Sequence, residues 1–274
     1  MKHFRSLALS LSAVAVSVSA VLAVGAALAE PKAPFEPRVG QPGRDVIWVP
    51  TADALVNRML DMARVGPGDI HFDLGSGDGR TVIAAAKRGA TAIGVEFNPD
   101  MVALSRRNAE AAGTGDRATF IEGDLFAADI SKASVITLFL LPSINIKLRP
   151  TILGLRPGTR VVSNSFDMGD WRPDRTDEAV DSCTSYCRAH FWIVPAKVEG
   201  TWKLPDGELR LNQHYQWFDG ELRTGVSSMA ISDGKVVGDQ ISFVAGDARY
   251  AGRVSGNAIE GLALSSVGFS ATRK

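Results

Sequence analysis

Residues 70–80 read Ile-His-Phe-Asp-Leu-Gly-Ser-Gly-Asp-Gly-Arg, and this stretch decides the fold. Its first five residues form a short apolar run of the kind that makes a buried strand. Three glycines follow at every second position from 75 to 79, and a helical pattern begins within 79–81. A glycine-rich turn between a strand and a helix lets a ligand approach the backbone, where the helix N-terminus presents unpaired N–H groups. The stretch therefore predicts a ligand-binding strand–loop–helix unit.

Apolar β-type runs alternate with helical patterns from Asp45 to Ala196, on both sides of this loop. That alternation is typical of a doubly wound, Rossmann-like parallel sheet, so we predict the α/β class. The expected helices cover 52–63 with Thr51 as the cap, 79–81 to Gly89, and a segment capped by Asn98 with Pro99 at its first position and Gly113 beyond its end. The expected strands are 70–74, 92–96, 118–122, 134–140 and 160–165, followed by a hairpin of 179–183 and 189–195.

The chain changes character after residue 196. Helical periods vanish, and short alternating segments are separated by Asp-Gly, Gly-Asp and Gly-Asn turns. Residues 234–241 and 252–259 repeat one plan. We therefore expect an α/β domain at 45–196 and a small antiparallel β-meander domain at 197–274, which either covers the first domain or binds a partner.

The N-terminal residues have the pattern of an export signal. Lys2 and Arg5 precede an apolar run from Leu7 to Leu28, and Ala27-Leu28-Ala29 matches an A-x-A cleavage site. The sequence predicts a cleaved signal peptide at 1–29, a proline- and glycine-rich linker at 30–44 and an exported, periplasmic protein. The alternative is an uncleaved leader that anchors the protein in the membrane, its only expected membrane contact.

Charge and cysteine content narrow the possible partners. Thirty basic residues balance thirty acidic ones, which disfavours binding to nucleic acid. The four histidines have no paired spacing, so no metal site is expected. Cys183 and Cys187 lie too far apart for a disulfide within a continuous strand, but they can meet if they flank a tight hairpin or share one helical turn. The oligomeric state is left open.

Acidic residues distinguish this loop from a dinucleotide site. Its glycine spacing is G-x-G-x-G rather than G-x-G-x-x-G, and Asp73 and Asp78 would repel a pyrophosphate. S-adenosylmethionine carries a sulfonium and an ammonium against one carboxylate, so nearby acids suit it. Glu96 closes the second strand, where a carboxylate can accept hydrogen bonds from ribose hydroxyls, unless it is a solvated strand end. Asp124 follows the third strand and is either an acceptor for the adenine amino group, with Leu125 against the ring, or a helix cap.

Residues 49–171 resemble the protein-lysine methyltransferase family of mitochondrial enzymes that modify the ATP synthase c-subunit and the adenine nucleotide translocase, with its bacterial relatives. The similar segments are Val49-Pro-Thr51, Asp73 to Arg80, Leu140 to Pro150, Pro157 to Val162 and Phe166 to Trp171. The resemblance implies a class I methyltransferase sheet and a cofactor site that includes Thr51, Asp73, Gly75, Gly77, Glu96 and Asp124, with Leu141-Pro142 beside the methyl group. Departures from that family are the β-rich end and the export signal.

The sequence therefore predicts an S-adenosylmethionine-dependent methyltransferase, with a protein lysine as the favoured acceptor. The full candidate set for the cofactor is Thr51, Asp73, Gly75, Ser76, Gly77, Glu96, Phe97, Asp124, Leu125 and Leu141. The substrate-side candidates, after the fourth and fifth strands, are Asn145, Asp167 and Trp171. A small-molecule or lipid acceptor, or a non-catalytic envelope protein with this fold, are the alternatives.

Overall fold

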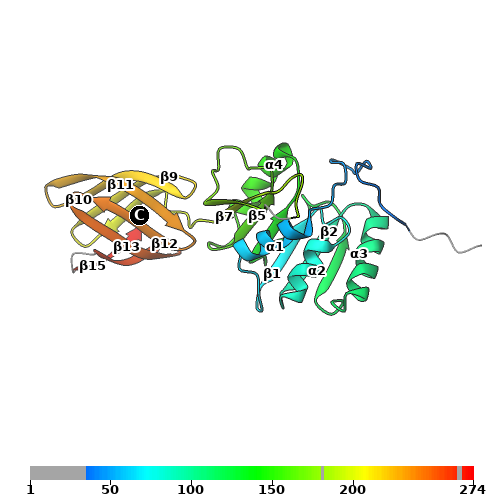
Figure 1. The fold of residues 1–274 in the computed structure, drawn as a ribbon. Coiled ribbons are helices and arrows are strands. Elements are labelled where there is room, and N and C mark those ends of the chain that lie inside the picture. Colours follow the sequence, from blue (N-terminus) through cyan, green and yellow to red (C-terminus); the bar gives the residue numbers. More distant parts are fainter. Residues whose placement is uncertain (1–34, 180–181, 264–266) are drawn as a thin grey trace, which may run out of the picture. The chain divides into compact units, whose positions relative to one another are not determined.

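The computed structural model describes residues 35–179, 182–263 and 267–274 of the 274-residue chain. The predicted leader at 1–29 lies outside the described residues. An α/β sheet region comes first along the chain, and a region made only of strands follows it (Figure 1). In the ranges that the structure describes, no helix has both the length and the apolar character needed to cross a membrane.

The first region is a seven-stranded sheet with the order β3-β2-β1-β4-β5-β7-β6. The first five strands run parallel, β7 is antiparallel to β5, and β6 is antiparallel to β7. The strand bounds are β1 Ile70–Leu74, β2 Thr91–Glu96, β3 Ala118–Glu122, β4 Val135–Leu138, β5 Arg160–Asn164, β6 Arg175–Glu178 and β7 Arg188–Ile193.

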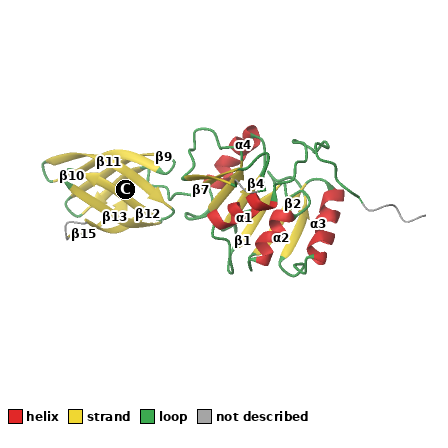
Figure 2. Ribbon diagram, viewed as in Figure 1, coloured by secondary structure: helices red, strands yellow, loops and turns green. Residues whose placement is uncertain are grey.

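Helices cover both faces of this sheet (Figure 2). They are α1 Asp53–Met62, α2 Arg80–Lys87, α3 Pro99–Ala111 and α4 Pro142–Leu153. Because side chains alternate along a strand, each strand feeds two cores. Phe72 and Leu74 pack in the core that includes α4, whereas Val135 and Val162 pack with α1, α2 and α3. The predicted doubly wound α/β class is confirmed.

Element bounds follow the sequence closely, with one cap misassigned. Strands β1 and β3 begin and end at the predicted residues, and the Asn98 side chain caps α3 by accepting from the backbone N–H of Asp100 at 2.9 Å. The prediction that Thr51 caps α1 is wrong: Ala52 is the capping residue and makes no side-chain cap bond. The Thr51 hydroxyl instead accepts from Asn164 Nδ2 at 3.1 Å, so a contact with the end of β5 takes the place of the local cap.

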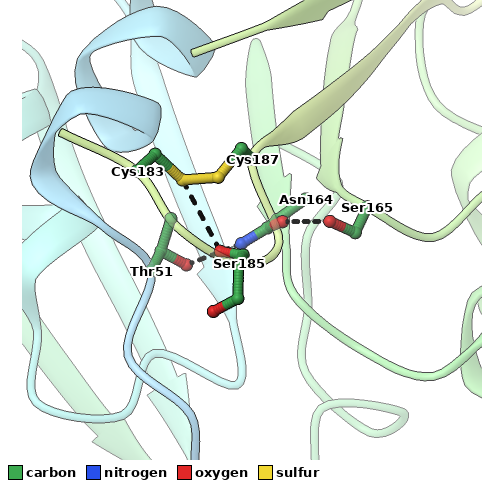
Figure 3. The surroundings of a disulfide bond; sticks show 6 residues. All are labelled: Thr51, Asn164, Ser165, Cys183, Ser185 and Cys187. Carbon is green, nitrogen blue, oxygen red and sulfur yellow. Dashed lines mark hydrogen bonds between the residues drawn. A yellow bond between two sulfur atoms is a disulfide. The ribbon is translucent and has the colours of Figure 1, made fainter. Parts of the chain in front are cut away.

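The predicted hairpin exists, but its first strand is β6 at Arg175–Glu178 rather than 179–183. Glu178 pairs with Arg188 in the antiparallel register, and a carboxylate–guanidinium bond of 2.8 Å joins their side chains. Residues 183–187 form part of the connection, closed by a disulfide between Cys183 and Cys187 whose Cα atoms are 5.7 Å apart (Figure 3). The two cysteines therefore meet because they flank a turn, one of the two arrangements that their spacing permits.

The all-strand region is a closed antiparallel barrel with the order β10-β11-β12-β13-β14-β15-β8-β9. Its strands are β8 Gly200–Leu204, β9 Gly207–His214, β10 Trp217–Thr224, β11 Ser227–Val237, β12 Gln240–Ala245, β13 Ala248–Ser255, β14 Ala258–Ala263 and β15 Val267–Arg273. The predicted antiparallel meander is confirmed, and the pairing of β15 with β8 closes it. Closure leaves no unpaired sheet edge, and apolar side chains such as Trp202, Leu209 and Phe243 fill the interior.

Gln216, in the turn between β9 and β10, is fully buried and contacts residues that follow β5. Trp171 Nε1 donates to Gln216 Oε1 at 3.0 Å, and Gln216 Nε2 donates to the Arg172 carbonyl at 2.8 Å. Tyr215 stacks against the Trp171 ring with centroids 6.0 Å apart. These bonds satisfy the polar atoms that the contact buries.

Candidate functional site

A cavity of about 530 Å³ lies at the loops that follow β1, β2, β3, β4 and β5. Ligands of open α/β sheets bind at the carboxyl ends of the strands, so this position is the expected one. All ten residues predicted to hold the cofactor line this cavity: Thr51, Asp73, Gly75, Ser76, Gly77, Glu96, Phe97, Asp124, Leu125 and Leu141. The fold thus brings together residues that are separated by up to 90 positions along the chain.

Asp73 is the most deeply buried of the carboxylates that line the cavity, with 6% of its surface exposed. The Thr137 hydroxyl donates to its Oδ1 at 2.6 Å. Burial, with the nearby charges of Asp78 and Glu96, raises the pKa of Asp73 to about 7. The carboxyl group therefore loses its proton near neutral pH. A cation bound beside it would offset the cost of burying the negative charge.

His71 supports this arrangement from two residues earlier on β1. Its Nε2 lies 2.8 Å from the Thr137 hydroxyl oxygen, and burial lowers the pKa of His71 to about 3. Because Thr137 donates its proton to Asp73, its oxygen accepts one from the neutral imidazole. A hydrogen-bonded row from His71 through Thr137 to Asp73 therefore fixes the carboxyl group from behind.

Glu96 joins the glycine loop to the start of α3. Its Oε2 accepts from the Gly77 backbone N–H at 3.0 Å, and its Oε1 accepts from the Asn98 N–H at 2.9 Å. A carboxylate that accepts two backbone bonds has a fixed position, so Glu96 presents an ordered negative charge on the cavity wall.

Two positions of the loop require glycine. At Gly79, φ is +83°, and an added Cβ would lie 2.7 Å from the Ser105 Cβ and 2.8 Å from the Phe120 ring. At Gly77, φ is +54°, and an added Cβ would lie 2.8 Å from the Trp48 indole nitrogen. The close packing around the loop therefore excludes side chains as well as favouring the left-handed backbone.

Asp124 makes two contacts in the structure. Its Oδ1 accepts from the Phe126 N–H at 2.9 Å, and its Oδ2 pairs with Arg44 at 2.9 Å. The Phe126 bond and then the Arg44 charge lower the pKa of Asp124 below its usual value. Arg44 also lies over the Phe97 ring, 4.5 Å from its centroid. Asp124 is thus ionised beside the cavity.

The segment before α1 forms part of the cavity wall, although sequence reasoning assigned no site residue before Thr51. Residues 41–51 line the cavity, and Gly40 and Gln41 exchange backbone bonds with Trp48 at 2.8 and 2.9 Å. The proline- and glycine-rich composition that indicates a linker hides this turn. The only signals of a role were the aromatic and basic side chains, Trp48 and Arg44, within such a stretch.

The substrate-side candidates do not line the cavity. Asn145 is buried, and its Nδ2 donates to the carbonyls of Phe166 and Asp167 at 3.2 and 3.1 Å. Asp167 is exposed, with its Oδ1 accepting from the Gly169 N–H, and Trp171 is buried against Gln216. The side chains that follow β4 and β5 and do line the cavity are Phe139, Leu140, Leu141, Ile144 and Phe166.

The hydrogen-bond acceptors that line the cavity suit S-adenosylmethionine. Asp73 lies one residue before the end of β1, Glu96 ends β2, and Asp124 lies two residues beyond β3. These three carboxylates are ready to accept hydrogen bonds from an ammonium, hydroxyls and an amino group. Sheet order, glycine loop and carboxylates together define a class I methyltransferase domain. In the described ranges, no group of three His, Cys, Asp or Glu side chains could hold a metal ion.

Comparison with known proteins agrees with this class. Residues 73–175 match the model of the ANTKMT methyltransferase domain. A protein-lysine N-methyltransferase of Saccharolobus islandicus is 42% identical over 139 residues, which are 50% of this chain and 86% of the relative. The human lysine N-methyltransferase of the ATP synthase c-subunit is 35% identical over 53% of this chain and 62% of its own. A solved RNA methyltransferase of Salinibacter ruber, in complex with S-adenosyl-L-homocysteine, is 49% identical with a TM-score of 0.51 and covers 55% of this chain and 96% of its own.

The chain therefore belongs to the ANTKMT-type family of S-adenosylmethionine-dependent methyltransferases. It is an enzyme that uses S-adenosylmethionine as its methyl donor. The similarity covers about half of the chain, and the matched range of the family model, residues 73–175, lies in the α/β region.

Proposed function

We propose that this methyltransferase transfers a methyl group to the side-chain amine of a lysine in a protein. The observation that carries the proposal is the similarity to a protein-lysine N-methyltransferase over 86% of that relative's length. The chemistry of the cavity supports it, because apolar and aromatic side chains line the wall after β4 and β5. A lysine side chain is a long apolar stem with an amine at its tip, which suits a wall of this kind.

The residues of the chain align and desolvate the two reactants. When bound, S-adenosylmethionine supplies a methyl group on a positively charged sulfur. Asp73, Glu96 and Asp124 hold the charged and hydroxyl groups of that molecule, and Leu140 and Leu141 exclude water from the side of the cavity after β4. No side-chain nucleophile is needed, because the acceptor amine itself attacks.

Proton and charge balance place one requirement on the acceptor side. The lone pair of the neutral amine forms the new N–C bond while the electron pair of the S–C bond stays on sulfur, so the positive charge ends on nitrogen. The attacking amine must therefore lose a proton first, and a desolvated apolar wall lowers the pKa of a lysine ammonium. A methylated product sheds its extra proton to solvent.

We also propose that the protein acts outside the cytoplasm. The apolar N-terminal run with its A-x-A site supports export, and the Cys183–Cys187 disulfide suits an oxidising compartment. A protein acceptor would then lie in the cell envelope. Fractionation of cells that carry a tag after Lys274 checks this, and full-length protein in the cytosol would contradict it.

Transfer of a radiolabelled methyl group into a cell lysate and an envelope extract tests the acceptor. After the reaction, protein, RNA and organic phases are separated, and the labelled protein is hydrolysed to amino acids. We expect the label in protein and, after hydrolysis, on methylated lysine. The Asp73→Ala variant serves as the control for enzyme-dependent label.

Other distributions of the label identify other acceptors. Label in RNA would replace the proposal with the activity named for the Salinibacter ruber relative. Label in the organic phase would indicate a lipid or another small apolar acceptor.

A further inference from the structure

Three aromatic rings, from three segments that connect strands of the sheet, lie together at one side of the cavity. Phe139 directly follows β4, Phe166 lies two residues beyond β5, and Tyr186 belongs to the connection between β6 and β7. The Phe139 ring centroid is 5.3 Å from that of Tyr186 and 6.2 Å from that of Phe166, and the last two are 6.0 Å apart. We call these three residues the aromatic wall.

The aromatic wall occupies the side of the cavity opposite the cofactor acids in the sheet order. Glu96 and Asp124 follow β2 and β3 on one side of β1, whereas Phe139 and Phe166 follow β4 and β5 on the other. With the cofactor held by the acids, the wall is a part of the cavity surface available to the acceptor.

The disulfide holds the third ring in place. The Cys183–Cys187 bond closes a loop of five residues, and Tyr186 within it has φ of +55°, a conformation that bulky residues rarely adopt. Thr51, Asn164 and Ser165, linked to one another by hydrogen bonds, are drawn beside this loop in Figure 3. Tyr186 is 45% exposed, so packing alone does not fix its ring. Strained backbone conformations of this kind cluster at functional sites.

The chemistry of such a wall selects cations. The face of an aromatic ring is electron-rich and attracts an ammonium, most strongly when water is excluded. Methyl transfer to an amine increases the positive charge on nitrogen, so aromatic faces favour the transition state and product over the neutral amine. Acceptors that stay neutral gain nothing from this attraction between a cation and an aromatic ring.

We propose that Phe139, Phe166 and Tyr186 form the acceptor subsite, which binds an alkylammonium group, and that the Cys183–Cys187 disulfide positions Tyr186 for this contact. The inference rests on the proposed function and names the part of the molecule that recognises the amine. It makes Tyr186 a determinant of acceptor affinity and makes that affinity sensitive to reduction of the disulfide.

Binding of a model cation tests the subsite without requiring turnover. Protein saturated with S-adenosylhomocysteine is titrated in a calorimeter with choline and with 3,3-dimethyl-1-butanol, its neutral isostere. We expect the wild type to prefer choline by about 2- to 30-fold, the range that a cation–aromatic contact supplies. Tyr186→Leu and the double variant Cys183→Ser/Cys187→Ser should lose most of this preference, and Tyr186→Phe should keep it.

Matched controls separate this effect from misfolding. Trp217 in β10 is 43% exposed, close to the exposure of Tyr186, so Trp217→Leu removes a comparable aromatic side chain from the barrel. That variant should keep the choline preference, and all variants should keep the affinity for S-adenosylhomocysteine. The single-residue variants should also keep the thermal midpoint, whereas loss of the disulfide lowers it. Equal binding of both isosteres by the wild type, or an unchanged preference in Tyr186→Leu, would overturn the subsite.

Kinetics distinguish failure of the subsite from failure of the proposed function. If the enzyme methylates a lysine peptide, Tyr186→Leu should raise the peptide KM at saturating S-adenosylmethionine. Lysine methylation with an unaffected KM would overturn the subsite and leave the function intact. A Tyr186-dependent choline preference without lysine methylation would support the subsite and assign the enzyme a different amine.

Discussion

Asp73 is the cavity residue whose burial most strongly opposes its ionisation. Its carboxyl group is buried beside Asp78 and Glu96, and the raised pKa of about 7 expresses the cost of ionising it there. A positively charged ligand removes that cost. Ionisation of Asp73 should therefore lower the stability of the ligand-free protein and raise its affinity for the cofactor. As pH rises, stability should fall and cofactor affinity should increase.

The stability of the ligand-free protein tests the first half of this statement. A native pKa above the unfolded value of 3.8 means that the native state holds the proton more tightly, so stability falls as pH rises from about 4 to about 7. We expect Asp73→Asn to remove this loss and to be more stable than wild type by up to about 4 kcal/mol near pH 8. Urea unfolding across this range measures the difference, and a constant difference between the two proteins would contradict the raised pKa.

Cofactor affinity tests the second half. Ionised Asp73 attracts the cationic ligand, so the affinity of the wild type for S-adenosylmethionine should rise as pH passes through about 7. Asp73→Asn should bind more weakly and lack that rise. S-adenosylhomocysteine, which has no sulfonium, serves as a comparison for the titration of the ligand.

At the scale of single residues, the sequence predicts which side chains belong to the site better than it predicts which contacts they make. The acids Asp73, Glu96 and Asp124 are recognisable because each lies at or just beyond the carboxyl end of a strand of a parallel sheet, and these ends share one edge. The pairing of Asp124 with Arg44 is not predictable in this way, because it joins residues 80 positions apart through an irregular segment. Asn145 and Trp171 are misleading for a related reason: polar atoms in a buried side chain bond equally well to the protein itself.

The glycine loop is the element on which the cofactor site depends. Gly79 is the N-cap of α2, has a left-handed backbone and packs against Ser105 and Phe120. Gly68, in the turn before β1, has a similar φ of +87° but no atom within 4 Å of an added Cβ. A side chain at Gly68 would cause only backbone strain, whereas a side chain at Gly79 would also clash with neighbouring atoms. Comparing the two positions therefore separates the two effects.

Replacing each glycine by alanine measures these two contributions. Gly68→Ala should cost about 1–2 kcal/mol, the price of the left-handed conformation alone. Gly79→Ala should cost about 1–3 kcal/mol more, because the methyl group displaces a packed ring, and should also weaken cofactor binding. Urea denaturation gives the free energies, and equal destabilisation of the two variants would contradict the packing around Gly79.

Elements with a strong local pattern are predictable, and those set by tertiary contacts are not. Strand β1, the glycine loop and the Asn98 cap follow from local signals alone. The start of α1 is different, since the Thr51 hydroxyl bonds to Asn164 rather than to its own helix. The β6–β7 hairpin is also displaced, because its register is set by pairing with β5 and by the disulfide in its connection.

At the scale of the whole molecule, Gln216 links the barrel to residues that follow β5. It accepts from Trp171 Nε1 and donates to the Arg172 carbonyl, and it is fully buried. Turn signals in the sequence predict the antiparallel strands on either side of it. They do not predict this contact or the closure by β15 and β8, which both depend on distant pairing.

Removal of the Gln216 amide should destabilise the protein as a whole. Gln216→Leu leaves the buried indole N–H of Trp171 without a partner, which costs about 1–3 kcal/mol, and also removes the part-buried bond to the Arg172 carbonyl. Gln240→Leu, at an exposed position in β12, is the matched control and should change stability little. Chemical denaturation of both variants checks this, and equal stabilities would show that the contact contributes nothing.

Calorimetric titration of the intact protein with S-adenosylmethionine tests the central claim most directly, namely that carboxylates on one edge of the sheet hold this cofactor. We expect one-site binding by the wild type and at least about tenfold weaker binding by both Asp73→Ala and Glu96→Ala, since each removes a cavity-lining carboxylate that would accept charge-assisted hydrogen bonds from the ligand. Absence of binding at millimolar ligand, or unchanged affinity in both variants, would contradict the account.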